Sequence, residues 1–90
     1  RLWTPLHFAC EEGKFFLAHR LVHARADKNA KNCASEAPLH VAALWGRANI
    51  VELLASAGAM IDVRNDGGAT PLHYALYRGH LDCAQILIQH

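Results

Sequence analysis

The amino-acid sequence repeats itself with a period of 33 residues. Thr-Pro-Leu-His at residues 4–7 returns as Ala-Pro-Leu-His at 37–40 and as Thr-Pro-Leu-His at 70–73. Six columns are identical in all three copies, which chance does not produce in one register: the Pro, Leu and His of this tetrapeptide, then Ala9, Gly13 and Leu21 with their counterparts. Self-similarity at a fixed period indicates a repeat architecture, in which each copy is a structural unit stacked on the next.

Each copy predicts two short helices followed by a turn-rich loop. A Pro in the first helical turn costs no hydrogen bond and Thr can cap a helix, so helices are expected to begin at Thr4-Pro5 and Thr70-Pro71. In the middle copy we expect helices at 38–45 and 48–57, each ending near a Gly suited to a left-handed position. The apolar residues of the second helix recur at helical spacing, and residues 59–69 predict an extended, hairpin-like loop. Helices this short must pack on a neighbouring copy.

This pattern resembles the ankyrin repeat family. The residues that carry the resemblance are Thr-Pro-Leu-His, an Ala two residues later, a Gly between the helices and a Leu-Leu pair, and they cover the whole chain. The resemblance implies an all-α ankyrin-repeat solenoid of stacked helix-turn-helix units joined by β-hairpin-like loops, with a concave groove between loops and first helices. We expect a single domain over residues 1–90, with repeats at about 1–36, 37–69 and 70–90. The outer copies look incomplete, so a fragment of a longer protein is expected.

Four departures from the family pattern fall in or beside the first copy. Arg20 replaces the first Leu of the pair, where a charge must reach solvent or lie at an open end of the stack. Arg25 replaces the Gly that ends the second helix, so this end must be strained or form another turn. Ala37 replaces the Thr whose hydroxyl, by the resemblance, bonds to the motif His, so His40 should lack one partner. Because Ala34-Ser35 also replaces Gly67-Gly68, we expect the first copy to be the least stable.

Composition excludes several classes of protein. Nine Lys and Arg against eight Asp and Glu give a net charge of +1, which creates no strong field for nucleic acid or an acidic membrane. No apolar stretch approaches the roughly 20 residues that span a bilayer, and a 52% hydrophobic content is too high for a disordered tail. Cys10, Cys33 and Cys83 are odd in number and widely spaced, which argues against a disulfide scaffold. We therefore predict an intracellular protein of the cytoplasm or nucleus.

Seven histidines raise the question of metal binding. The three motif histidines are each expected to bridge their own helix start and the adjacent loop, and His80 and His90 are expected at the surface. His19 and His23 lie four residues apart on one predicted helix and could share a metal, with Cys10 as a third ligand. Two ligands are not a site, so we favour solvated histidines and predict no metal.

No arrangement of residues indicates catalysis. Cys10 and His7 are the nearest Cys/His pair, but Cys10 occupies a small-residue position and is expected to pack as a hydrophobe. The adjacent carboxylates at 11–12 have no partner set that suggests acid–base chemistry. We predict that the chain is not an enzyme and binds no cofactor or small-molecule substrate.

Binding is the function that the residues favour. By the resemblance, the contact positions of the family are the ends of the first helices and the loop tips. The helix positions here are Glu11, Glu12, Leu44, Trp45, Tyr77 and Arg78, and the loop-tip positions are Trp3, Cys33, Ala34, Glu36, Asp66, Gly67 and Ala69. Trp, Tyr and Arg are the residues that most often anchor interfaces. The alternative is that Trp45 and Tyr77 fold onto the next repeat as core.

We therefore predict a module that binds a partner protein or peptide of mixed character. An apolar anchor would contact Trp45 and Tyr77, an acidic group Arg78, and a basic group Glu11 and Glu12. Two alternatives stay open: a regulatory or substrate-targeting segment of a larger enzyme or channel, and a structural spacer in a longer array.

A covalent modification is a separate hypothesis. In ankyrin proteins an Asn in a comparable loop can be hydroxylated, which makes Asn29 a candidate. Lys28 departs from the apolar neighbour that is usual there.

Overall fold

Each copy of the repeat folds into two helices, as predicted. The computed structural model describes residues 2–90, and over this range it contains helices and no strand. In the middle copy both helices end one residue earlier than expected, because Trp45 and Ala57 are their C-caps. The helices are α1 (Pro5–Glu12), α2 (Phe15–His23), α3 (Pro38–Leu44), α4 (Ala48–Ser56), α5 (Pro71–Arg78) and α6 (Leu81–Gln89).

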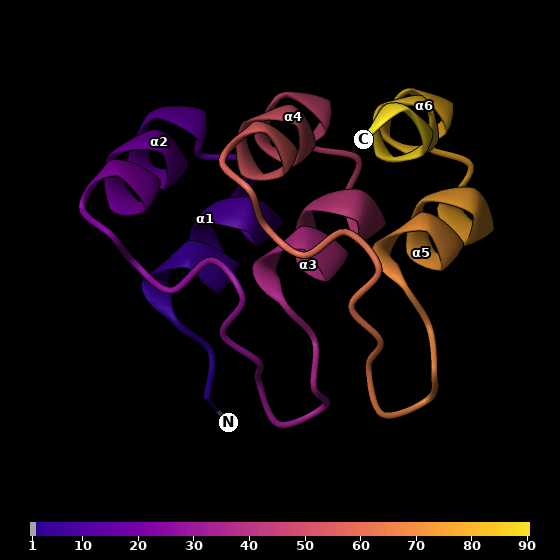
Figure 1. Ribbon diagram of the computed structural model, residues 1–90, viewed down its shortest axis with the longest axis horizontal. Helices are drawn as coiled ribbons and strands as arrows, with labels where there is room; N and C mark the ends of the chain where they lie inside the picture. Colours follow the sequence, from indigo (N-terminus) through magenta and orange to yellow (C-terminus); the bar gives the residue numbers. More distant parts are fainter. Residues whose placement is uncertain (1) are drawn as a thin grey trace.

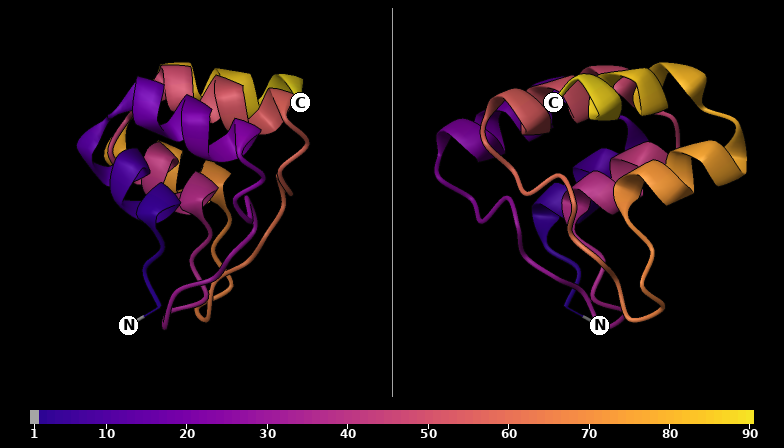
Figure 2. Two further views of the ribbon diagram at one scale, coloured as in Figure 1. Left: turned by 90° about the vertical axis from the view of Figure 1, so that its left-hand side faces the viewer. Right: turned by 45° about the vertical axis from the view of Figure 1, so that its right-hand side comes forward.

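The helices form two layers. Figure 1 shows α1, α3 and α5 side by side in one layer and α2, α4 and α6 in a second layer above it. The two long loops, between α2 and α3 and between α4 and α5, project beyond the first layer on the side away from the second (Figures 1 and 2). The all-α solenoid is confirmed, and its loops turn back on themselves without forming strands in the described residues.

The motif residues start the first helices as predicted. The Thr4 hydroxyl accepts from the His7 backbone N–H at 3.3 Å, and His7 Nδ1 accepts from the Thr4 backbone N–H at 3.1 Å. Thr70 caps α5 in the same way. In α3 only the Ala37 N–H contacts His40 Nδ1, at 3.1 Å, and no hydroxyl contributes. The expected loss of one partner at His40 is confirmed.

Two of the three motif histidines join neighbouring repeats. His7 Nε2 donates to the Glu36 carbonyl at 2.7 Å, and His40 Nε2 donates to the Ala69 carbonyl at 2.8 Å. Both side chains are fully buried. His73 contacts Thr70 at its own helix start through Nδ1, but it is exposed and its Nε2 has no partner in residues 2–90, which contain no loop after α6. Burial lowers the pKa of His40 below its ordinary value, against smaller opposing effects of the Ala69 hydrogen bond and the Glu36 charge.

The core lies between the two helix layers. It is built from aliphatic side chains together with two cysteines, and its largest fully buried apolar members are Leu6, Leu39, Ile50, Leu54, Val41 and Val51. Cys10 and Cys83 have no exposed surface, and burial raises the pKa of Cys10 to about 12 and that of Cys83 to about 11. The prediction that Cys10 packs as a small hydrophobe is confirmed.

The first copy adopts left-handed backbone where the second has glycine. Arg25 has a φ of 68° and Ser35 a φ of 61°, at the positions of Gly58 (90°) and Gly68 (83°). The chain therefore keeps the same turns and accepts backbone strain at these two side chains. Arg20 is exposed, so its charge stays in solvent and no buried charge arises at that position.

Candidate functional site

Two asparagines close the loops that project from the helices. The Oδ1 atoms of Asn32 and Asn65 each accept from the backbone N–H groups two and four residues further on, at 2.9–3.0 Å. Sequence reasoning missed this pair, although the two residues are one period apart. Columns identical in all three copies do not include these asparagines, because only two copies contain this part of the loop.

The tips of the two loops are bonded to each other. The Asp66 N–H donates to the Ala34 carbonyl at 3.1 Å, and the Ser35 hydroxyl donates to Asp66 Oδ1 at 2.6 Å. Asp66 is exposed, as a partner contact requires, but one of its carboxylate oxygens is already used within the chain.

Glu36 is held inside a polar network at the base of the loops. Its carboxylate accepts from the Tyr74 hydroxyl at 2.6 Å and from Asn32 Nδ2 at 3.0 Å, and Tyr74 in turn accepts from Asn65 Nδ2 at 2.6 Å. Burial and, next, the hydrogen bond to Glu36 raise the pKa of Tyr74 to about 12, which keeps this hydroxyl a donor. Glu36, predicted as a loop-tip contact, therefore links its loop to Tyr74 of the next repeat. Cys33, another predicted loop-tip residue, is an exposed free thiol.

The six predicted helix positions form a row across the ends of the first-layer helices. We call this row the contact strip; it consists of Glu11, Glu12, Leu44, Trp45, Tyr77 and Arg78. Since α1, α3 and α5 pack side by side, residues at equivalent positions lie about 10 Å apart, the usual spacing of packed helices.

The aromatic residues of the contact strip are accessible. Trp45 is 41% exposed although a further repeat follows it, so it is not a core residue, and Tyr77, on the last first-layer helix of this sequence, is 86% exposed. The Arg78 guanidinium lies over the Trp45 ring, with Cζ 5.4 Å from the ring centroid. Sequence reasoning placed these residues next to one another but did not foresee that Arg78 and Trp45 stack in a cation–π contact across two repeats.

The acidic end of the strip borders an aromatic hollow. Glu12 is exposed and Glu11 is partly buried. Glu11 shares an open pocket of about 550 Å³ with Leu2, Trp3 and Phe8. The Trp3 and Phe8 rings pack at a centroid distance of 5.1 Å. This end therefore offers a carboxylate beside apolar surface.

His80 connects two repeats and is not a simple surface residue, contrary to expectation. It is partly buried, and its Nε2 donates to the Leu44 carbonyl at 3.1 Å. Arg47, one period earlier, donates to the Glu11 carbonyl in the same way. Both carbonyls belong to residues of the contact strip, so these donors fix the ends of α1 and α3, two of the three helices that carry it.

The histidines of α2 pair with each other. The His19 and His23 rings stack with centroids 4.1 Å apart, and His23 Nδ1 donates to the His19 carbonyl at 2.9 Å. Cys10, considered as a third ligand, is fully buried. Over residues 2–90 no group of three or more His, Cys, Asp or Glu side chains is arranged to hold a metal.

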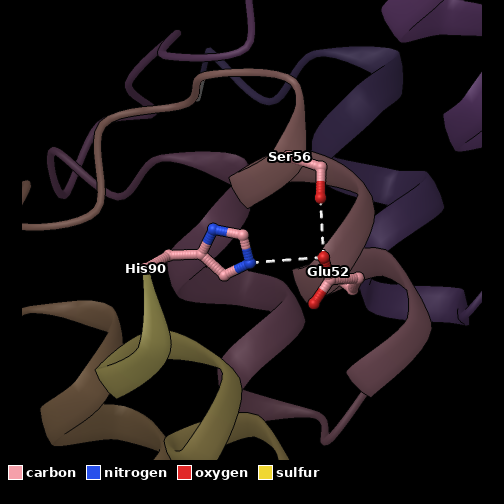
Figure 3. A network of polar contacts seen from close by, with 3 residues as sticks. All are labelled: Glu52, Ser56 and His90. Atoms are coloured by element: carbon pink, nitrogen blue, oxygen red, sulfur yellow. Dashed lines mark hydrogen bonds and ion pairs between the residues drawn. The ribbon is translucent and has the colours of Figure 1, made fainter.

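Glu52, Ser56 and His90 form a polar network on the outer layer (Figure 3). The Ser56 hydroxyl and His90 Nε2 both donate to Glu52 Oε2, at 2.6 Å and 3.2 Å. The Ser56 hydrogen bond is the main cause of a lowered pKa for Glu52. Within the described chain the Ser56 hydroxyl bonds to Glu52, and no hydrogen bond joins it to His90. The network links α4 to the end of α6.

Comparison with known proteins agrees with this architecture. Residues 6–90 match the family model for ankyrin repeats, in three copies. No curated protein matches the chain. Of the helices that the structure describes, none has both the length and the apolar character needed to cross a membrane.

Proposed function

We propose that this chain, which belongs to the ankyrin repeat family, is a non-catalytic module that binds a partner protein or peptide through its contact strip. Ankyrin repeats are generally protein–protein interaction modules and are typically non-catalytic. The family alone does not say which face binds or what chemistry the partner has.

The observation that carries the proposal is the exposure of Tyr77 beside the Trp45–Arg78 stack. Trp45 stands at the end of α3, where His80 of the next repeat donates to the Leu44 carbonyl, and the Arg78 guanidinium lies over its ring. The equivalent residues of the first copy are Glu11 and Glu12, so packing between repeats does not require an aromatic at these positions. Exposed aromatics that the fold does not need are typical of interfaces.

The strip favours a partner segment of mixed character. An apolar side chain would pack against Tyr77 and Trp45. A partner carboxylate would meet Arg78, whose guanidinium presents a fork of N–H groups suited to bidentate bonding. A basic side chain would lie at Glu11 and Glu12, giving the bound segment one preferred direction.

Two further parts of the proposal concern chemistry and location. The thiols of Cys10 and Cys83 are buried with raised pKa values, which supports a binding function over a nucleophilic one. All three cysteines are free thiols, which supports a reducing, intracellular compartment.

The experiment compares wild type with the double variant Trp45→Ala/Tyr77→Ala. Both proteins are immobilised after circular dichroism has verified equal helix content, and the proteins that each retains from a cell lysate are identified by mass spectrometry. The matched control is Gln85→Ala/Gln89→Ala, which removes two exposed side chains of α6 in the other layer. We expect a protein held by wild type and by the control but lost by the contact-strip variant. Identical retention by all three proteins would contradict the proposal and favour a structural spacer.

A further inference from the structure

The outer surface of α2 differs in chemistry from that of the other second-layer helices. Phe16, His19 and His23 occupy positions where α4 has Asn, Glu and Ser and α6 has Asp, Gln and Gln. These positions are exposed in all three copies, so stacking of repeats does not determine them. Only α2 combines an exposed phenylalanine with imidazoles here.

The rings of α2 form a continuous row along the helix. Phe15 contacts Phe16 at a centroid distance of 5.6 Å and His19 at 6.0 Å, and His19 stacks on His23 at 4.1 Å. Phe16 is 80% exposed, although burial of a phenylalanine would normally stabilise a protein. The row therefore presents aromatic surface to solvent.

The first repeat carries more positive charge than the second. Residues 13–35 contain five Lys or Arg residues and one carboxylate, Asp27. The equivalent residues 46–68 of the second copy contain two Lys or Arg residues and three carboxylates. The net charge of +1 for the whole chain conceals this difference between repeats. An anionic partner would distinguish the first repeat from the second.

Arg25 keeps its charge at the cost of backbone strain. It is exposed and has a φ of 68°, where the second copy has Gly58. A side chain is disfavoured in this left-handed conformation, and glycine is the residue that relieves the strain. Strain that persists at a surface position is a reason to look for a function there.

A hollow beside these cations can receive an apolar side chain. It has a volume of about 410 Å³ and lies where the C-terminal parts of α2 and α4 meet. Val22 and Leu53 supply its apolar lining, and His23 and Lys28 supply a polar edge. Apolar surface bordered by cations suits an acidic segment with one apolar residue better than it suits a flat lipid surface.

We propose that the outer face of α2 is a second docking surface, separate from the contact strip, for an acidic peptide segment that carries an apolar side chain. We call this surface the outer strip; it consists of Phe16, His19, Arg20 and His23 of α2, together with Arg25 and Lys28 of the segment that follows the helix. Carboxylates of the segment pair with the cations, and its apolar side chain occupies the hollow at Val22 and Leu53. The two strips lie on different helix layers, so one chain can hold two partner segments at once.

The test measures binding of a defined peptide by fluorescence anisotropy. The probe is a short fluorescein-labelled peptide with a central Leu flanked by Glu on both sides, and the control peptide has Gln in place of Glu. We expect the Glu peptide to bind wild type at least about tenfold more tightly than the Gln peptide, with affinity that falls as salt is added.

Variants separate the outer strip from general electrostatics. Arg25→Gly/Lys28→Ser should weaken binding of the Glu peptide about tenfold, whereas Arg64→Ser, which removes a cation of the second loop, should change it less than about twofold. Arg25→Gly alone should weaken binding while leaving Tm equal or higher by up to about 5 °C, because glycine relieves the strain at this position. Loss of binding could then not be attributed to unfolding.

Three outcomes would overturn the proposal. One is equal affinity of wild type and Arg25→Gly/Lys28→Ser for the Glu peptide. Another is equal affinity of wild type for the Glu and Gln peptides. The third is binding to phosphatidylserine-containing vesicles without measurable binding of the Glu peptide, which would assign the strip to a membrane surface.

Discussion

The Arg47 side chain caps the helix of the preceding repeat by donating to the backbone carbonyl of Glu11. Its Nε lies 3.2 Å and its Nη2 2.7 Å from that oxygen. The last carbonyls of a helix have no partner within the helix, so this guanidinium satisfies a group that α1 itself leaves open. One repeat later, His80 Nε2 donates to the Leu44 carbonyl in the same way. The link therefore recurs along the stack with different side chains.

Replacing Arg47 by Ala should destabilise the protein by about 1–3 kcal/mol, since it removes a charged donor and leaves a partly buried carbonyl unpaired. The free energy of unfolding from urea titration measures this loss. Arg64→Ala is the matched control, because Arg64 is exposed and donates only to the Gly68 carbonyl of its own loop. Equal loss in the two variants would show that the Arg47 link contributes nothing beyond a surface arginine.

The glycines between the helices leave room for these donors. A Cβ at Gly46 would lie 2.7 Å from His80 Nδ1, whereas a Cβ at Gly79 would meet nothing within 4 Å. Both residues have left-handed backbone, with φ of 72° and 74°. Gly79→Ala should therefore cost about 1–2 kcal/mol from backbone strain alone. Gly46→Ala should cost about 1 kcal/mol more, because His80 must move and its hydrogen bond is lost.

Thermal and chemical denaturation of both glycine variants separates these two contributions. The double variant Gly46→Ala/His80→Ala lacks the side chain that would clash, so its cost relative to His80→Ala should fall to that of Gly79→Ala. If Gly46→Ala and Gly79→Ala are equally destabilised, the close approach to His80 has no energetic consequence.

The sequence predicted the features that depend on local backbone chemistry. Thr4, Thr70 and their prolines identify helix starts because capping and the fixed φ of Pro act within one turn. The links between repeats were not predictable in the same way. Arg47 and His80 occupy one column with different residue types, so what recurs is a hydrogen-bond donor and not an identity.

In the candidate site, too, the positions could be predicted from the sequence but the side-chain contacts between repeats could not. The resemblance located the contact strip, and the residue types indicated its charge pattern. The stacking of Arg78 on Trp45 depends on side-chain rotamers across two repeats, which no pattern in the sequence encodes. Likewise, Glu36 looked like a loop-tip contact until the fold brought Tyr74, from the next repeat, within 2.6 Å of its carboxylate.

Ala37 is a position where stability can be gained. The equivalent Thr70 accepts from the His73 N–H at 3.3 Å, and its hydroxyl lies 2.9 Å from His73 Nδ1, to which it donates. Ala37→Thr should restore both bonds at His40 and stabilise the protein by about 0.5–1.5 kcal/mol. Thr70→Ala should destabilise by a similar amount. Urea unfolding of the two variants checks the pair, and a loss of stability in Ala37→Thr would mean that the buried site cannot accommodate the larger side chain.

His40 makes the stability of the stack sensitive to acid. Its Nδ1 accepts from the Ala37 N–H, and this bond requires the neutral imidazole, whereas the Nε2–H can donate to the Ala69 carbonyl in either protonation state. Burial lowers the pKa of His40 in the folded protein, whereas the unfolded chain titrates near the ordinary value of about 6.5. Above that pH both states are neutral and the contribution of His40 is fully present. As the pH falls below it, the unfolded state takes up the proton first, and stability is lost until the pH passes the folded-state pKa.

Urea unfolding at pH values from about 7.5 down to about 5 tests this dependence, because that range spans the ordinary titration of histidine. His40→Gln should be less stable than wild type near pH 7.5, since it disturbs a buried hydrogen-bonded position, but it should lose less stability on acidification. His73→Gln is the control: His73 is exposed and lacks the bond to a following loop, so this variant should keep the wild-type acid sensitivity. An unchanged pH profile in His40→Gln would mean that other groups cause the acid sensitivity and that the buried imidazole does not.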